Sequence, residues 1–118
     1  MNKKQLKQAY KETPKMMGIY RIFNQKENRV FLGASHDIQA RLNRHKAELN
    51  FGAHRLKALQ SDWKRLGSNA FQFEIVEELS PPEDNLDYDP KEDLAALLEM
   101  LLEKENYLPE QLYIGTII

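Results

Sequence analysis

The first third of the chain alternates between β-prone runs and a polar turn. Residues 18–23 (GIYRIF) and 29–33 (RVFLG) are rich in branched and aromatic side chains, and the five residues between them, 24–28, are turn formers. Two such runs joined by a short polar segment are typical of antiparallel strands. The pattern therefore predicts a β-hairpin.

A helix is predicted directly after the hairpin. Ile38, Leu42 and Leu49 recur at intervals that place them on one helix face. Ser35 is the predicted N-terminal cap, because a short hydroxyl side chain can accept a hydrogen bond from a free backbone N–H of the first turn. Gly52 lies just past the last apolar position and predicts the end of the helix.

A second helix and a third strand follow. Residues 55–66 place their leucines and Trp63 on one face, which we assign to the core, and Gly67 ends the helix. Alternation with a period of two then predicts a strand with one buried face. Its apolar positions Phe71, Phe73 and Ile75 alternate with Gln72, Glu74 and Val76.

The last third predicts one long helix between two less regular segments. Residues 80–90 form an acidic loop bounded by prolines, and residues 91–105 carry a broad leucine stripe. The order β-β-α-α-β-α predicts a small α/β layer protein of the α+β type, with a three-stranded, mainly antiparallel sheet flanked by helices. We expect this domain to span residues 17–105, between an N-terminal helix or arm (1–16) and an apolar C-terminal tail (106–118). The tail is expected to pair with the sheet, or with a second copy of the chain in a homodimer.

Composition narrows the class of protein. The chain has 118 residues, 42% of them hydrophobic, and no cysteine, which is enough for one folded domain. The lack of cysteine excludes a disulfide scaffold, a cysteine zinc site and a thiol nucleophile. No segment approaches the roughly 20 apolar residues that cross a bilayer. We therefore expect a soluble, cytoplasmic protein with no membrane partner.

Charge is divided unevenly along the chain. Residues 1–69 carry 15 Lys and Arg against 5 Asp and Glu, a net charge of +10, whereas residues 70–118 carry 2 against 13, a net charge of −11. Blocks of one sign commonly form solvated faces. The alternative is that the basic part faces phosphate groups, while the acidic part faces away from them or holds a cation.

Six short motifs occur in a defined order. They are GIY at 18–20, FLG at 31–33, Arg41 with His45 on the first helix, GAH at 52–54, LQSDWKRLG at 59–67 and FQFEIVEEL at 71–79. In this order they resemble the GIY-YIG endonuclease family, and the similarity covers roughly residues 17–105. The resemblance implies a GIY-YIG nuclease-like fold, DNA as the partner, and phosphodiester hydrolysis with Mg²⁺ or Mn²⁺ as cofactor.

Tyr20, Arg41 and His45 are the predicted catalytic residues. Arg41 and His45 are four positions apart on a helix, so both project from one side and can converge with Tyr20 over one face of the sheet. A guanidinium group suits phosphate because its planar fork donates two hydrogen bonds at once. By resemblance, Tyr20 orients or activates the water, Arg41 binds the scissile phosphate and His45 assists proton transfer. The structural alternatives are a strand aromatic, an arginine whose stem covers Leu42, and a helix-surface histidine.

Further residues near this set are candidates for substrate binding. They are Phe31, Gly33, Ser35, Arg44 and His54. Two of them have structural alternatives, Ser35 as a helix cap and His54 as a turn residue.

The chain departs from the family pattern at the metal site. The family holds its ion on a glutamate of the last helix, and Leu98 occupies that position here. Glu99 is the predicted metal ligand in its place, although one step along a helix rotates a side chain by about 100°. Glu92 and Glu103 are alternatives.

Two smaller departures lie near the predicted catalytic residues. Phe31 stands where the family normally carries a tyrosine and lacks the hydroxyl group, and Ala40 stands where a polar residue often precedes the arginine. Three functions stay open at this point. They are a metal-dependent endonuclease, a catalytically impaired nucleic-acid-binding module, and a homodimerising interaction domain.

Overall fold

The computed structural model describes residues 15–82 and 87–113. At its centre is an antiparallel sheet of three strands, β1 (Met17–Asn24), β2 (Arg29–Ser35) and β3 (Phe71–Leu79), in the order β2-β1-β3. The predicted hairpin is confirmed, because β1 and β2 pair in the register Tyr20↔Gly33 across the turn at 25–28. The predicted α+β class with a three-stranded sheet is also confirmed.

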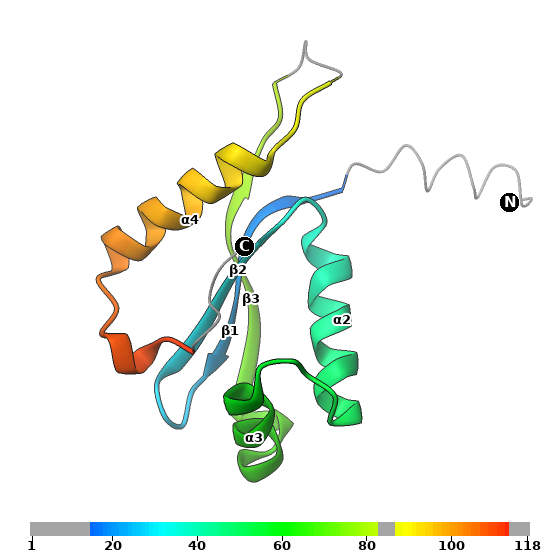
Figure 1. Ribbon diagram of the computed structural model, residues 1–118, viewed down its shortest axis with the longest axis vertical. Helices are drawn as coiled ribbons and strands as arrows, with labels where there is room; N and C mark the ends of the chain where they lie inside the picture. The colour runs from blue at the N-terminus through cyan, green and yellow to red at the C-terminus, as the bar shows by residue number, and fades with distance from the viewer. Residues whose placement is uncertain (1–14, 83–86, 114–118) are drawn as a thin grey trace, which may run out of the picture.

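Helices cover both faces of the sheet. The first two, α2 (Ile38–Phe51) and α3 (Lys57–Leu66), share an apolar cluster with one face, and α4 (Lys91–Glu105) packs against the other. Figure 1 shows the sheet between α2 and α4. Two 3₁₀ turns complete the described elements, η1 (Ser68–Ala70) and η2 (Pro109–Gln111). Alternation along β1 explains the two clusters: Tyr20 and Ile22 lie in the first, and Ile19 lies in the second.

The start of α2 differs from the prediction. The cap is Asp37, whose Oδ1 accepts the backbone N–H of Ala40 at 3.3 Å. Ser35 is still in the strand, and its Oγ accepts the N–H of Asp37 at 3.0 Å. Ser35 therefore shapes the turn that leads to the cap, while Asp37 satisfies the free N–H of the first helical turn.

The start of α3 also differs by two residues. The helix begins at Lys57 and not at Arg55, because Leu56 is extended (φ −86°, ψ 101°). The backbone N–H of Leu56 donates to a side chain, Nδ1 of His54, at 3.1 Å. This contact makes residues 54–56 a tight turn before the helix.

A bulge in β3 changes which of its side chains are buried. Tyr20 pairs with Ile75 and Ile19 pairs with Glu77, so Val76 is the extra residue. Beyond the bulge the faces exchange, so that Leu79, an odd-numbered position like Phe71, packs in the cluster under α4 and not in the first cluster. Ile75, on the apolar side of the predicted strand, is 47% exposed. Gly18 lies beside the bulge with φ +152°, and a Cβ there would be 2.0 Å from the carbonyl oxygen of Glu77. Only glycine fits at this position.

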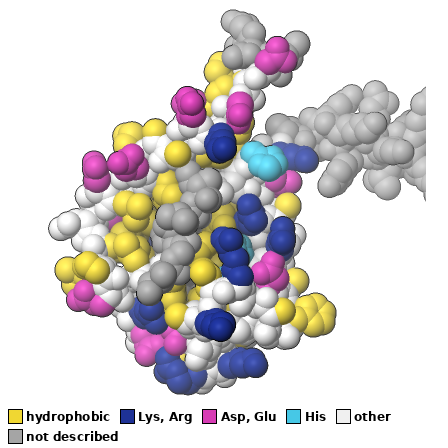
Figure 2. Space-filling view, viewed as in Figure 1, with side chains coloured by type: hydrophobic (Ala, Val, Ile, Leu, Met, Phe, Trp, Pro, Cys, Tyr) yellow, Lys and Arg dark blue, Asp and Glu magenta, His cyan; other side chains and the backbone are white. Residues whose placement is uncertain are grey.

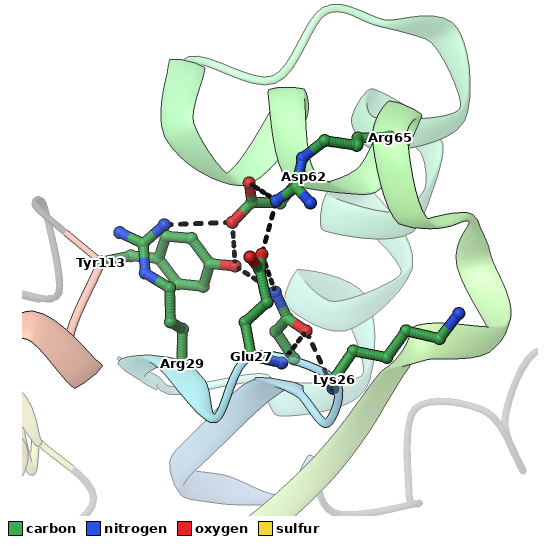
Figure 3. A network of polar contacts seen from close by, with 7 residues as sticks. Lys26, Glu27, Arg29, Asp62, Arg65 and Tyr113 are labelled. Atoms are coloured by element: carbon green, nitrogen blue, oxygen red, sulfur yellow. Dashed lines mark hydrogen bonds and ion pairs between the residues drawn. The ribbon is translucent and has the colours of Figure 1, made fainter.

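The C-terminal segment pairs with the sheet, which is one of the two alternatives predicted for the tail. Leu112 forms a parallel bridge with Val30, and the N–H of Tyr113 donates to the carbonyl of Val30 at 2.9 Å. The Tyr113 side chain is 1% exposed and its hydroxyl donates to Asp62 at 2.8 Å, in the polar network of Figure 3. Association of two copies through the tail stays a prediction.

Parts of the predicted segments lie outside the described residues. These are 1–14 of the N-terminal arm, 83–86 of the acidic loop and 114–118 of the tail. Within the described ranges, we find no helix with the length and apolarity needed to cross a membrane.

Candidate active site

A cavity of about 180 Å³ opens between the β1–β2 hairpin and α2. The three predicted catalytic residues Tyr20, Arg41 and His45 all line it. The other lining residues are Phe31, Ala34, Arg44, Glu48 and Arg55. The predicted convergence is therefore confirmed, and its cause is local: Tyr20 points from β1 toward α2, and α2 presents Arg41 and His45 one turn apart.

The ring of Tyr20 lies directly over Gly33 of the neighbouring strand. A Cβ on Gly33 would be 2.4 Å from both Cζ and the hydroxyl oxygen of Tyr20. Gly33, a candidate for substrate binding, is not among the residues that line the cavity, and its position makes room for the Tyr20 ring. The ring is buried, with 3% of the residue exposed, and Tyr20 is one of the residues that line the cavity.

Tyr20, His45 and His54 form a hydrogen-bonded chain. The Tyr20 hydroxyl is 2.8 Å from Nε2 of His45, and Nδ1 of His45 is 2.8 Å from Nε2 of His54. Both histidines are buried, 7% and 6% exposed. The chain ends at the N–H of Leu56, which donates to Nδ1 of His54. His54 thus does not line the cavity but contacts a residue that does.

Gln60 of α3 places His54 in this chain. Its Oε1 accepts the backbone N–H of His54 at 2.9 Å, and its Nε2 donates to the carbonyl of Leu49 at 3.0 Å. Gln60 joins the end of α2 to the loop and is 8% exposed. Gln60 is part of the LQSDWKRLG motif, but the sequence pattern alone does not indicate this role.

Burial shifts the proton equilibria of all three groups. Burial raises the pKa of Tyr20 to about 12, against the opposing effect of Arg41 and Arg55. Burial, and then the neighbouring His54, lower the pKa of His45 to about 4. Burial also lowers the pKa of His54. At neutral pH, Tyr20 therefore keeps its proton and both imidazoles are neutral.

The rim of the cavity is positively charged. Arg41, Arg44 and Arg55 line it together with one carboxylate, Glu48, whose Oε1 is 2.9 Å from Nε of Arg44. Figure 2 shows Lys and Arg side chains gathered over α2 and toward α3, while Asp and Glu predominate over α4. Arg55 and Glu48 were absent from the predicted site. The signals for them are adjacency to His54 in sequence and the i,i+4 spacing from Arg44.

A second cavity of about 340 Å³ adjoins the first. The two share Ala34 and Arg41. Its remaining lining residues are Ser35, His36, Asp89, Pro90, Lys91 and Leu94. Ser35, a predicted binding residue, therefore lies in this neighbouring cavity, and Arg41 connects the two.

The predicted metal ligand is not brought to either cavity. Leu98 is 4% exposed and packs in the cluster under α4, on the face of the sheet opposite Tyr20. Glu99, on the exposed side of α4, is in the lining of neither cavity. In the two described ranges, no three His, Cys, Asp or Glu side chains come together as a metal-binding group. The donor set of the first cavity is a single carboxylate already paired with an arginine, so these residues do not form a preformed cation site.

This chain belongs to the GIY-YIG family, since residues 16–112 match the model of the GIY-YIG catalytic domain. It is 30% identical over 95 residues to intron-associated endonuclease 1 of Enterobacteria phage T4. That match covers 80% of this chain but 32% of the relative, so the chain spans about a third of the curated protein it matches.

Two solved structures share the fold. One is a mutant form of the catalytic domain of intron endonuclease I-TevI, with a TM-score of 0.64 and 28% identity over 83% of this chain and 91% of that one. The other is the catalytic domain of homing endonuclease I-TevI, with a TM-score of 0.62 and 25% identity over 82% and 95%.

Proposed function

We propose that this chain is the catalytic domain of a DNA endonuclease that hydrolyses phosphodiester bonds. The observation that carries the proposal is the first cavity, which a buried tyrosine lines together with three arginines. Membership of the GIY-YIG family and similarity to intron and homing endonucleases support the same chemistry.

Arg41 and Tyr20 have complementary roles in this reaction. Hydrolysis of a phosphodiester adds negative charge to the phosphate oxygens in the transition state, which fixed hydrogen-bond donors stabilise. Arg41 supplies a bidentate donor to the scissile phosphate, and Tyr20 acts at the reacting centre. His45 holds the Tyr20 hydroxyl at 2.8 Å.

The remaining cations extend the binding surface beyond the reacting phosphate. Arg44 and Arg55 lie on the same cavity, and Lys91 lies on the adjoining one. Phosphate contacts by such residues position a nucleic acid without reading its sequence. We therefore assign neighbouring backbone phosphates to them.

Dependence on Mg²⁺ or Mn²⁺ is part of the proposal because GIY-YIG nucleases generally need a divalent metal ion. Mg²⁺ often binds through one or two carboxylates together with substrate phosphates. The two carboxylates to test are therefore Glu99, the predicted ligand, and Glu48, which lines the cavity. Nicking by Glu99→Gln and Glu48→Gln, titrated with Mn²⁺, separates the two. A raised metal requirement in one variant alone identifies the carboxylate, and an unchanged requirement in both contradicts a role for either.

Nicking of supercoiled plasmid in the presence of Mg²⁺ or Mn²⁺ tests the proposal. Tyr20→Phe and Arg41→Ala should each lower the rate by about a hundredfold or more, the scale of losing a transition-state donor. Lys104→Ala, an exposed change at the end of α4, is the matched control and should nick normally. Equal nicking by all four proteins, or none by the unmodified chain over a range of ions, contradicts the proposal.

A binding module without catalysis is the second candidate. It is favoured by the donor set of the first cavity, where Glu48 is the one lining carboxylate among the described residues and is already paired with Arg44. DNA retardation at increasing salt tests it, because each phosphate contact contributes a slope of about −0.9 in log K against log salt. Salt-dependent binding with no nicking supports the module. Undetectable binding at low salt excludes it.

A further inference from the structure

The order of donors and acceptors in the chain Tyr20–His45–His54 is set from its far end. The backbone N–H of Leu56 can only donate, and it lies 3.1 Å from Nδ1 of His54. Nδ1 of His54 is therefore an acceptor. A neutral imidazole carries one proton, so the proton of His54 lies on Nε2.

The proton on Nε2 of His54 in turn fixes the proton of His45. Nε2 of His54 donates to Nδ1 of His45 at 2.8 Å. The two ring planes are 24° apart and their centroids are separated by 5.1 Å, close to the largest separation that this nitrogen contact allows. The contact therefore lies near the plane of both rings, as an imidazole hydrogen bond requires. The proton of His45 is then on Nε2, facing the Tyr20 hydroxyl oxygen.

We infer that His54 is a positioning residue that makes His45 a hydrogen-bond donor to Tyr20 and so turns the Tyr20 hydroxyl proton toward the cavity. The inference rests on the proposed function and deepens it, because it states how Tyr20 meets the substrate. Tyr20 presents a donor to a phosphate oxygen and does not give its proton to His45.

The cavity fits a phosphate at this point. The guanidinium groups of the arginines on its rim carry hydrogen-bond donors and no acceptor atom. Glu48, the one carboxylate among the described lining residues, already accepts a hydrogen bond from Arg44. The outward Tyr20 proton and the guanidinium groups are hydrogen-bond donors that a phosphate oxygen can accept.

The chain of histidines holds Tyr20 but does not conduct a proton. Transfer from Tyr20 through both rings would require His54 to pass a proton on from Nδ1, where a peptide N–H already points at the ring. A peptide N–H keeps its proton, so the chain is closed at that end. Both imidazoles are neutral at neutral pH because burial lowers their pKa values.

The tautomers can be read directly on the unmodified chain by long-range ¹H–¹⁵N NMR at neutral pH. We expect both His45 and His54 to show a protonated Nε2 and an unprotonated Nδ1, with the exposed His36 as the internal reference. A proton on Nδ1 of His45 would overturn the inference. The measurement needs no DNA, so it stands even if the proposed nuclease activity fails.

Two variants at position 54 test the positioning role. In His54→Gln, the side-chain amide can still donate to Nδ1 of His45, whereas His54→Leu has no donor. We expect His54→Leu to populate both His45 tautomers and to lose about tenfold or more in kcat for nicking with little change in KM, since an imidazole in the wrong tautomer can cost several orders of magnitude. His54→Gln should keep the Nε2 proton and recover most of the rate. Normal nicking by His54→Leu with mixed tautomers would show that the donor direction is irrelevant to the reaction.

Discussion

The ring of Tyr20 occupies the space that a side chain on Gly33 would fill. The two residues are paired across β1 and β2, and a Cβ on Gly33 would lie 2.4 Å from the Tyr20 hydroxyl oxygen. The glycine of the FLG motif therefore leaves room for the tyrosine of the GIY motif. It allows the phenol to lie flat on the sheet and reach His45.

Gly33→Ala should separate Tyr20 from His45. The added methyl group overlaps the ring, so the phenol must move, and a displacement of about 1 Å at a reacting centre can lower a rate by about a hundredfold. We expect nicking to fall by that order, with a loss of about 1–3 kcal/mol in the free energy of unfolding. Urea denaturation and the plasmid assay measure both quantities. Full activity in Gly33→Ala would contradict the proposed contact.

Stability should fall with acid between about pH 6.5 and pH 4. The pKa of His45 is lowered from 6.5 to about 4 in the folded state. The unfolded chain therefore binds more protons in this interval, and the free energy of unfolding decreases as the pH falls. The upper limit from His45 is roughly 3 kcal/mol, and His54 acts in the same direction.

Urea denaturation across this interval checks the pH dependence. The variant His45→Gln should show a shallower decline, because Gln does not titrate. An equal slope in both proteins would assign the decline to other groups.

Phe31→Tyr should strengthen the interaction with the phosphate. Phe31 is 1% exposed, lines the cavity, and its ring centroid is 5.3 Å from that of His45. A hydroxyl at this position adds a donor where the family normally has one, and one hydrogen bond of about 1 kcal/mol corresponds to about a fivefold change. We expect nicking to rise by that order. Phe31→Leu is the matched control and should not rise.

Asp62→Asn should weaken the fold without affecting the site. Asp62 accepts hydrogen bonds from Arg29 at 3.0 Å, Arg65 at 2.8 Å and Tyr113 at 2.8 Å (Figure 3). Burial alone would raise the pKa of Asp62, but the bonds from Arg65 and Tyr113 lower it. Loss of the charge should decrease the free energy of unfolding by about 2 kcal/mol.

The readout for Asp62→Asn combines urea denaturation with plasmid nicking. Nicking should be normal at temperatures where the variant is folded, because neither Asp62 nor any of its three hydrogen-bond donors lines the cavity. A rate defect in the folded variant would contradict this separation of stability from activity.

Local patterns were sufficient to predict the elements and the convergence of Tyr20, Arg41 and His45. Helical periodicity fixes which residues share a face, and strand alternation fixes which face Tyr20 joins. The cap of α2 was misassigned because Ser35 and Asp37 both have suitable side chains, and only the strand pairing decides where β2 ends. Period-two alternation does not contain the bulge after Ile75, so it does not predict that Leu79 joins the cluster under α4.

The sequence pattern does not predict contacts between segments that are distant along the chain. His54 joins the site through His45, nine residues earlier, and through Gln60 in the next helix. The distance of Glu99 from the cavity depends on which face of the sheet α4 covers. Neither depends on spacing along the chain alone.

The end of the histidine chain at Leu56 has a consequence for sequence drift. The donor is a main-chain group, and nineteen of the twenty amino acids carry it, whatever their side chains. The side chain at position 56 can therefore change during evolution without altering the direction of the hydrogen bonds that reach Tyr20. Proline alone would remove the backbone N–H that donates to His54.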